Sequence, residues 1–115
     1  DLDVWNKGVS LVRDIYKLTK NYPKDEVYGL ANQMRRAAVS IPSNIAEGAS
    51  RNSDKEFIQF LYIALGSASE LETQIIISRN LSYIEDSESQ TYLDYIESLK
   101  KMLNGLITHL KRKSL

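Results

Sequence analysis

The sequence predicts an all-α protein, an antiparallel up-down-up-down four-helix bundle in which residues 1–115 form a single domain. Apolar side chains recur at spacings of three and four residues along four segments, which is the period of one helix face. The connections between these segments are short, as they are between antiparallel neighbours in a bundle. The chain has only 5 Gly and 2 Pro, too few to separate the many strands of a β-sandwich or barrel.

The first helix is expected from Asp3 to Asn21. It ends there because Pro23 restricts the residue before it to extended conformations. Its apolar positions form a stripe at helical spacing: Trp5, Gly8, Val9, Val12, Ile15, Tyr16 and Thr19.

The second helix is expected from Asp25, whose carboxylate suits a first turn, to about Gly48. Pro42 lies inside its apolar stripe and removes one hydrogen bond of the helix ladder, so we expect a continuous helix with a kink at Pro42. The stripe comprises Val27, Leu30, Met34, Ala37, Ala38, Ile41 and Ile45.

The third helix, from Asp54 to about Asn80, carries two apolar stripes. Ser53 followed by Glu56 is the pattern of an N-terminal capping box. The first stripe contains Phe57, Phe60, Leu61, Ala64, Ala68, Leu71 and Ile75. The second lies roughly a quarter turn away and contains Ile58, Tyr62, Leu65, Ser69 and Ile76.

Two stripes on one helix indicate burial on more than one side. A small bundle covers one side of each helix well, so the second stripe predicts a contact with another copy of the chain. Periodicity alone leaves open which stripe is the core. The candidate interface residues are Ile58, Tyr62, Leu65 and Ile76.

The fourth helix follows the acidic stretch from Glu85 to Glu88. Its apolar positions alternate spacings of four and three without a break, as in the seam of a bundle: Tyr92, Ile96, Leu99, Leu103, Leu106 and Leu110. Acidic residues at its start and basic residues at its end complement the helix dipole.

The composition argues against an enzyme. There is no Cys, and His109 is the only His, so disulfides, thiolate sites and most His-dependent triads are excluded. No Glu-x-x-His pair supports a di-iron centre, and no glycine-rich phosphate loop occurs. We therefore expect no catalytic residues, no metal, no cofactor and no small-molecule substrate. No apolar run approaches the ~20 residues of a membrane span, so we expect no membrane association and a cytoplasmic location.

The adjacent Arg35 and Arg36 allow two interpretations. One of them could pair with a carboxylate on the neighbouring helix, such as Glu70 or Glu72, and fix the register. Alternatively, both could bind phosphate with their planar guanidinium groups. The first interpretation is favoured because Lys plus Arg and Asp plus Glu are equal, at 15 each, so the chain has no excess of basic charge.

Several strings in the chain resemble one family: "QMRRAAVSIPSNIAEG" at 33–48, "FIQFLYIALG" at 57–66 and "SELET" at 69–73, with Asp3-Val4-Trp5 near the start. They look like the four-helix bundle proteins encoded in intervening sequences of 23S rRNA genes. The resemblance implies an antiparallel four-helix bundle that assembles into a homopentamer. It also implies kinship with the accessory variability determinant of diversity-generating retroelements, which binds nucleic acid and a reverse transcriptase.

Two hypotheses for function follow. In the first, the protein is a homo-oligomer that binds rRNA, another nucleic acid or a nucleoprotein such as a reverse transcriptase. The candidate phosphate-binding residues are Arg35, Arg36, Arg51, Lys55, Lys111, Arg112 and Lys113. In the second, it is an oligomeric scaffold for proteins without nucleic-acid binding. Zero net charge disfavours general polyanion affinity, but a ring of subunits can still concentrate a local basic site.

Overall fold

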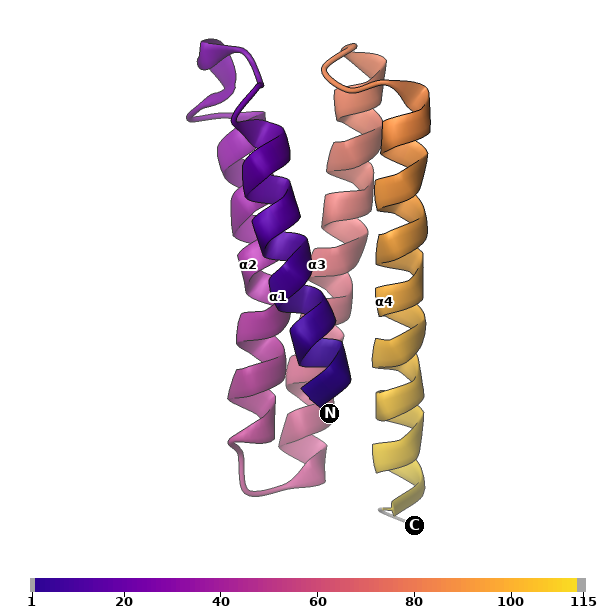
Figure 1. Ribbon diagram of the computed structural model, residues 1–115. Coiled ribbons are helices and arrows are strands. Elements are labelled where there is room, and N and C mark those ends of the chain that lie inside the picture. Colours follow the sequence, from indigo (N-terminus) through magenta and orange to yellow (C-terminus); the bar gives the residue numbers. More distant parts are fainter. Residues whose placement is uncertain (1, 114–115) are drawn as a thin grey trace.

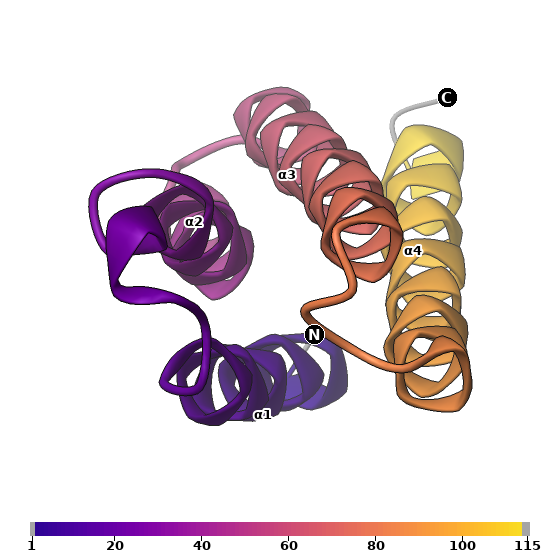
Figure 2. The ribbon, with the colours of Figure 1, turned by 90° about the horizontal axis from the view of Figure 1, so that it is seen from above.

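Four antiparallel helices form the structure, a computed structural model that describes residues 2–113. They are α1 (Leu2–Thr19), α2 (Leu30–Ala49), α3 (Asp54–Asn80) and α4 (Asp86–Lys113), with a short 3₁₀ turn, η1 (Lys24–Glu26), between the first two. Each helix reverses the direction of the one before it (Figure 1), and neighbours in the chain are also neighbours around the bundle (Figure 2). The predicted up-down-up-down bundle is confirmed.

The core is one cluster to which all four helices contribute. On α3, the first predicted stripe is the core stripe, with Leu61, Ala64, Ala68, Leu71 and Ile75 all buried. The predicted seam of α4 is also confirmed: Tyr92 and Leu106 are partly buried against the core, and Ile96, Leu99, Leu103 and Leu110 are buried.

The predicted core stripe of α1 was partly wrong. Trp5, Val9 and Tyr16 are 37%, 42% and 41% exposed. Ile15 of the predicted stripe is buried as expected, and the other apolar side chains of α1 that enter the core are Val4, Leu11 and Leu18. Two apolar stripes run along this helix about 100° apart, and helical spacing alone does not tell which one faces the partner helices.

The second helix starts later than predicted. The chain after Pro23 forms η1, and α2 begins at Leu30 rather than at Asp25. Gly29 interrupts the helix with φ −114° and ψ −119°, and Glu26 caps the new start by accepting a hydrogen bond from the Leu30 N–H at 3.1 Å. As a result Val27, predicted in the core, is 55% exposed.

The two predicted features at the middle and end of α2 have different outcomes. The helix is continuous through Pro42, as expected; the kink there stays a prediction. Pro42 is buried against α1, where a Cβ on Gly8 would lie 3.4 Å from the proline ring. The predicted cap of α3 is confirmed, since the Ser53 hydroxyl accepts from the Glu56 N–H at 3.2 Å.

Glu26 ties η1 to the turn between α3 and α4, and its pKa is expected to report that contact. Its carboxylate accepts from the Tyr83 hydroxyl at 2.8 Å and from the Leu30 N–H. Both bonds favour the charged form and lower the pKa of Glu26 below its ordinary value of 4.5. The associated stability is complete above the ordinary pKa and is lost as the pH falls through the lowered one.

We expect Tyr83→Phe to raise the pKa of Glu26 towards 4.5, because it removes the larger of the two causes. The pKa is measured by NMR titration of the Glu26 carboxyl carbon. Tyr28→Phe is the matched control, since Tyr28 is nearby in sequence and 93% exposed. If Tyr83→Phe leaves the pKa of Glu26 unchanged, the hydrogen bond between these two residues is contradicted.

Candidate nucleic-acid interface

Five of the predicted phosphate-binding residues meet at one end of the bundle. The turn between α2 and α3 and the last turn of α4 lie at the same end (Figure 1). Lys113 Nζ lies 3.6 Å from Asp54 Oδ2, and Lys111 Nζ donates to the Tyr62 hydroxyl at 2.7 Å. We call this group the end cluster; its members are Arg51, Lys55, Lys111, Arg112 and Lys113.

Much of the charge in the end cluster is already matched. Arg51 lies 3.3 Å from Glu47 and stacks on the Phe60 ring at 4.8 Å, while Lys113 pairs with Asp54. Within residues 2–113, Lys55 and Arg112 are the members without a carboxylate or aromatic partner. Exposed pairs of this kind contribute little to stability, but they reduce the charge that the cluster presents to a polyanion.

Arg35 lies far from the end cluster and joins α2 to α1. Its Nε donates to the Thr19 hydroxyl at 2.8 Å, its Nη2 donates to the Tyr16 carbonyl at 3.3 Å, and the guanidinium lies 4.5 Å from the centre of the Tyr16 ring. Arg35 therefore has the predicted structural role of linking two neighbouring helices, but its partners lie on α1 and not on α3.

The expected carboxylate partners on α3 bond elsewhere. Glu72 pairs with Lys100 of α4 at 2.8 Å. Glu70 lines a shallow pocket together with Arg36, but Arg36 is exposed and forms no ion pair within the described part of the chain. The prediction that Arg35 or Arg36 pairs with Glu70 or Glu72 was wrong.

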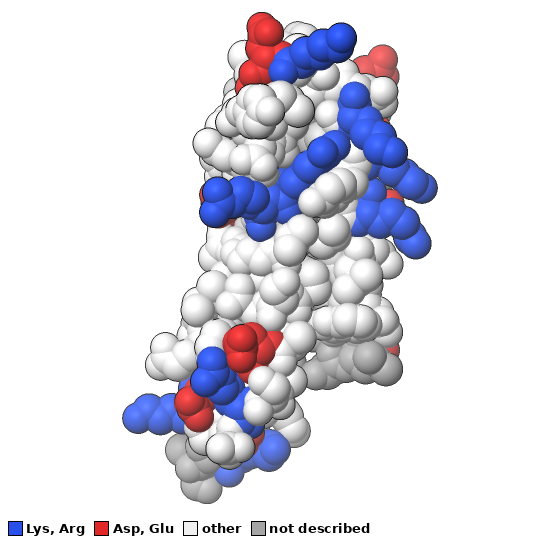
Figure 3. Space-filling view, turned by 90° about the vertical axis from the view of Figure 1, so that its left-hand side faces the viewer, with Lys and Arg blue, Asp and Glu red and all other residues white. Residues whose placement is uncertain are grey.

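A second basic surface lies where α1 ends and α2 begins. Basic side chains crowd the upper half of the face in Figure 3, and an uncharged zone separates them from a mixed group at the bottom. Residues 13–36 contain six basic and only three acidic residues. We call this surface the α1–α2 basic face; its basic residues are Arg13, Lys17, Lys20, Lys24, Arg35 and Arg36.

Four of these residues were not singled out in the sequence. Arg13, Lys17, Lys20 and Lys24 follow one another at spacings of four, three and four, and all four are exposed. The spacing of Arg13, Lys17 and Lys20 is that of one helix face, so this part of the signal was present, whereas Lys24 follows Pro23 and lies in η1. This spacing is a less obvious pattern in the sequence than the adjacent pair Arg35-Arg36.

The predicted oligomer interface is only partly exposed. Tyr62 and Ile76 are 45% and 38% exposed, whereas Ile58 and Leu65 are half-buried against the core. Lys111 of α4 contacts Tyr62, so this stripe borders the groove between α3 and α4. Two further apolar residues on the outer side of α3 were missed, Ile63 and Ile77, which are 51% and 41% exposed.

Neither a metal site nor a membrane span is found among residues 2–113. No group of three or more His, Asp or Glu side chains there could hold a metal ion. None of the described helices is long and apolar enough to cross a bilayer.

The chain is similar to proteins of one family. The model of the family described as 23S rRNA-intervening sequence protein matches residues 1–105. A crystal structure of a protein of unknown function from the S23 ribosomal protein family of Bacteroides thetaiotaomicron is 25% identical, with a TM-score of 0.86, covering 94% of this chain and 97% of that one. Among curated proteins, none matches the chain.

Proposed function

Because the chain belongs to the family of 23S rRNA-intervening sequence proteins, we propose that it is a non-enzymatic homo-oligomer that binds RNA through the α1–α2 basic face. The family is named for intervening sequences of 23S rRNA, so rRNA is the first RNA to test. Five copies per assembly is the number that the resemblance implies.

The observation that carries this proposal is the separation of charge along the molecule. The α1–α2 basic face gathers six of the 15 basic residues in 24 positions, and Lys17, Lys20 and Lys24 extend from it without a carboxylate partner within residues 2–113. Lys and Arg side chains that are not already paired are the ones that neutralise phosphates and release counterions. A neutral chain can therefore present a positive surface to RNA.

The oligomer rests on apolar surface that the monomer leaves in solvent. Tyr62, Ile63, Ile76 and Ile77 of α3 are all more than a third exposed. Residues 57–69 of α3 contain no charged side chain, so α3 itself presents no charge to a second copy along this stretch. Depletion of charged residues is typical of the core of an interface. A symmetric assembly would also repeat the α1–α2 basic face around a ring.

RNA binding is tested by gel-shift titration of the wild-type protein against structured RNA at several salt concentrations. We expect binding at low salt that weakens steeply as salt rises, because the contacts are to phosphates. Light scattering on the same sample gives the number of subunits. Undetectable binding at low salt would refute RNA binding, and a monomer would refute the assembly.

A protein scaffold is the second candidate function. It is favoured by apolar side chains on α1 that are more than a third exposed, namely Trp5, Val9 and Tyr16. A nucleoprotein such as a reverse transcriptase would combine the two functions. Pull-downs from native lysate with and without nuclease distinguish them: a stoichiometric protein partner that survives nuclease supports the scaffold, and one that is lost with the RNA supports RNA binding.

A further inference from the structure

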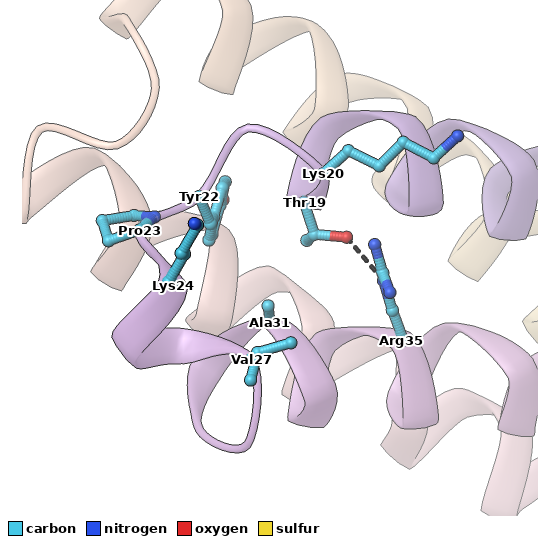
Figure 4. A pocket seen from close by; sticks show the side chains of 8 residues that line it. All are labelled: Thr19, Lys20, Tyr22, Pro23, Lys24, Val27, Ala31 and Arg35. Carbon is cyan, nitrogen blue, oxygen red and sulfur yellow. Dashed lines mark hydrogen bonds between the residues drawn. The ribbon is translucent and has the colours of Figure 1, made fainter.

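A cavity of about 460 Å³ opens between the end of α1, η1 and the first turns of α2. Its volume falls within the range of sites that bind small ligands, roughly 300–1,000 Å³. Three of its lining residues are cationic and none is acidic (Figure 4): Thr19, Lys20, Tyr22, Pro23, Lys24, Val27, Ala31 and Arg35.

Arg35 is held in place on the wall of this cavity. Its Nε donates to the hydroxyl of Thr19, which is itself buried and donates to the Ile15 carbonyl at 2.7 Å. Its Nη2 donates to the Tyr16 carbonyl. The guanidinium has five N–H groups, so three remain for a ligand. A planar, fixed guanidinium with spare donors suits the two oxygens of a phosphate.

Arg35 lies on the α2 side of the cavity in Figure 4, and Lys20, just after the end of α1, and Lys24 of η1 lie on two other sides of it. Both lysines are exposed, and neither forms an ion pair within residues 2–113. Their flexible side chains can reach a ligand seated between them, and their charges are not already matched by a carboxylate.

The rest of the lining is apolar or aromatic. Pro23, Val27 and Ala31 form one wall, and Val27 is 55% exposed although it was predicted in the core. Tyr22 is buried beside them, and this burial raises its pKa above 10.0, so it stays neutral. The cavity thus joins a cationic rim to an uncharged wall.

From this arrangement we infer that the cavity is a nucleotide-phosphate site. Lys20, Lys24 and the free N–H groups of Arg35 hold the phosphate, and the wall at Pro23 and Val27 packs against the sugar or base. The inference deepens the proposed RNA binding and rests on it for the identity of the ligand. It assigns the main contact to the α1–α2 basic face and not to the end cluster.

The test compares two double variants that each remove two exposed lysine or arginine charges. Lys20→Ala/Lys24→Ala changes the cavity, and Lys55→Ala/Arg112→Ala changes the end cluster. Affinity for a short single-stranded RNA without terminal phosphates is measured by fluorescence anisotropy at several salt concentrations. We expect the cavity variant to bind at least about tenfold more weakly and to lose about 1.4 from the salt slope, since each contact on a single strand contributes about 0.7. The control should change less than about twofold.

A second measurement uses free ligands and does not depend on RNA. Uridine 5′-monophosphate and inorganic phosphate are titrated while the methyl NMR signals of Val27 and Ala31 are followed. Both ligands should shift these signals in the wild type and not in Lys20→Ala/Lys24→Ala. Val27→Ser should weaken binding of the nucleotide but not binding of inorganic phosphate, because it removes only the apolar wall.

The outcomes separate the cavity from the wider proposal. RNA binding that falls equally in both double variants would overturn the cavity site and leave RNA binding in place. Mononucleotide binding at Val27 without RNA binding by the wild type would support the cavity and overturn the proposed function. If the wild type binds neither RNA nor the mononucleotide, both the cavity site and the proposed function are overturned.

Discussion

Leu61→Glu is expected to unfold the protein. Leu61 of α3 belongs to the core cluster and is fully buried, with no exposed surface. A carboxylate placed there has no cation or hydrogen-bond donor to compensate for lost hydration, and such burial costs several kcal/mol or shifts the group to its neutral form. Domains of this kind are stable by only about 5–15 kcal/mol. Far-UV circular dichroism at 20–25 °C should therefore show loss of most helical signal.

The adjacent residue supplies the matched control. Tyr62→Glu introduces the same charge one position along α3, but Tyr62 is 45% exposed, so the variant should keep its helical signal. Its molar mass in solution should fall, because Tyr62 belongs to the proposed contact between copies. Loss of helicity in both variants would contradict the assignment of the core stripe, and an unchanged mass for Tyr62→Glu would contradict the interface.

Helical periodicity predicted the elements well because it reflects local geometry. It gave the bounds of α3 with its Ser53 cap, and it gave the core seam of α4. The fourth helix begins at Asp86, inside the acidic stretch that was expected to precede it. Helical periodicity did not decide between stripes on α1, where Val4 is buried and Trp5 is exposed. That choice depends on where the other helices pack. Pro42 of α2 packs next to Gly8, where a Cβ would lie 3.4 Å from the proline ring, and no local pattern in α1 predicts that contact.

The start of α2 could not be predicted from propensity. Asp25 and Glu26 suit a first helical turn, and the structure uses them in η1 instead. A long-range contact supports the observed boundary, since Glu26 bonds both to the Leu30 N–H and to Tyr83 in the turn between α3 and α4. The displaced segment forms one wall of the cavity, so the same contact positions the candidate site.

Charged partners were the least predictable part of the candidate site. The sequence shows that Arg35 has charge and a planar donor group, but not that its partners are a hydroxyl and a carbonyl of α1. Likewise Glu72 pairs with Lys100, a residue twenty-eight positions away. Only the spacing of Arg13, Lys17 and Lys20 on one helix face was within reach of sequence reasoning.

Gly48→Ala is expected to destabilise the protein by about 1–3 kcal/mol, even though alanine favours helices more than glycine does. Gly48 is buried near the end of α2, and a Cβ there would lie 2.8 Å from Cδ1 of Phe57 and from Cβ of Phe60, and 3.2 Å from the Phe57 carbonyl. The last two atoms cannot rotate away, so α2 and α3 would have to separate. Gly48→Leu should cost more.

Gly105→Ala in α4 tests whether the effect comes from packing. Gly105 is exposed, and a Cβ there meets nothing within 4 Å, so the same change should stabilise the protein by about 0.5–1 kcal/mol through helix propensity. Urea unfolding of both variants gives the two free energies of unfolding. Shifts of opposite sign are expected. A stabilising shift for Gly48→Ala would show that the α2–α3 contact yields easily.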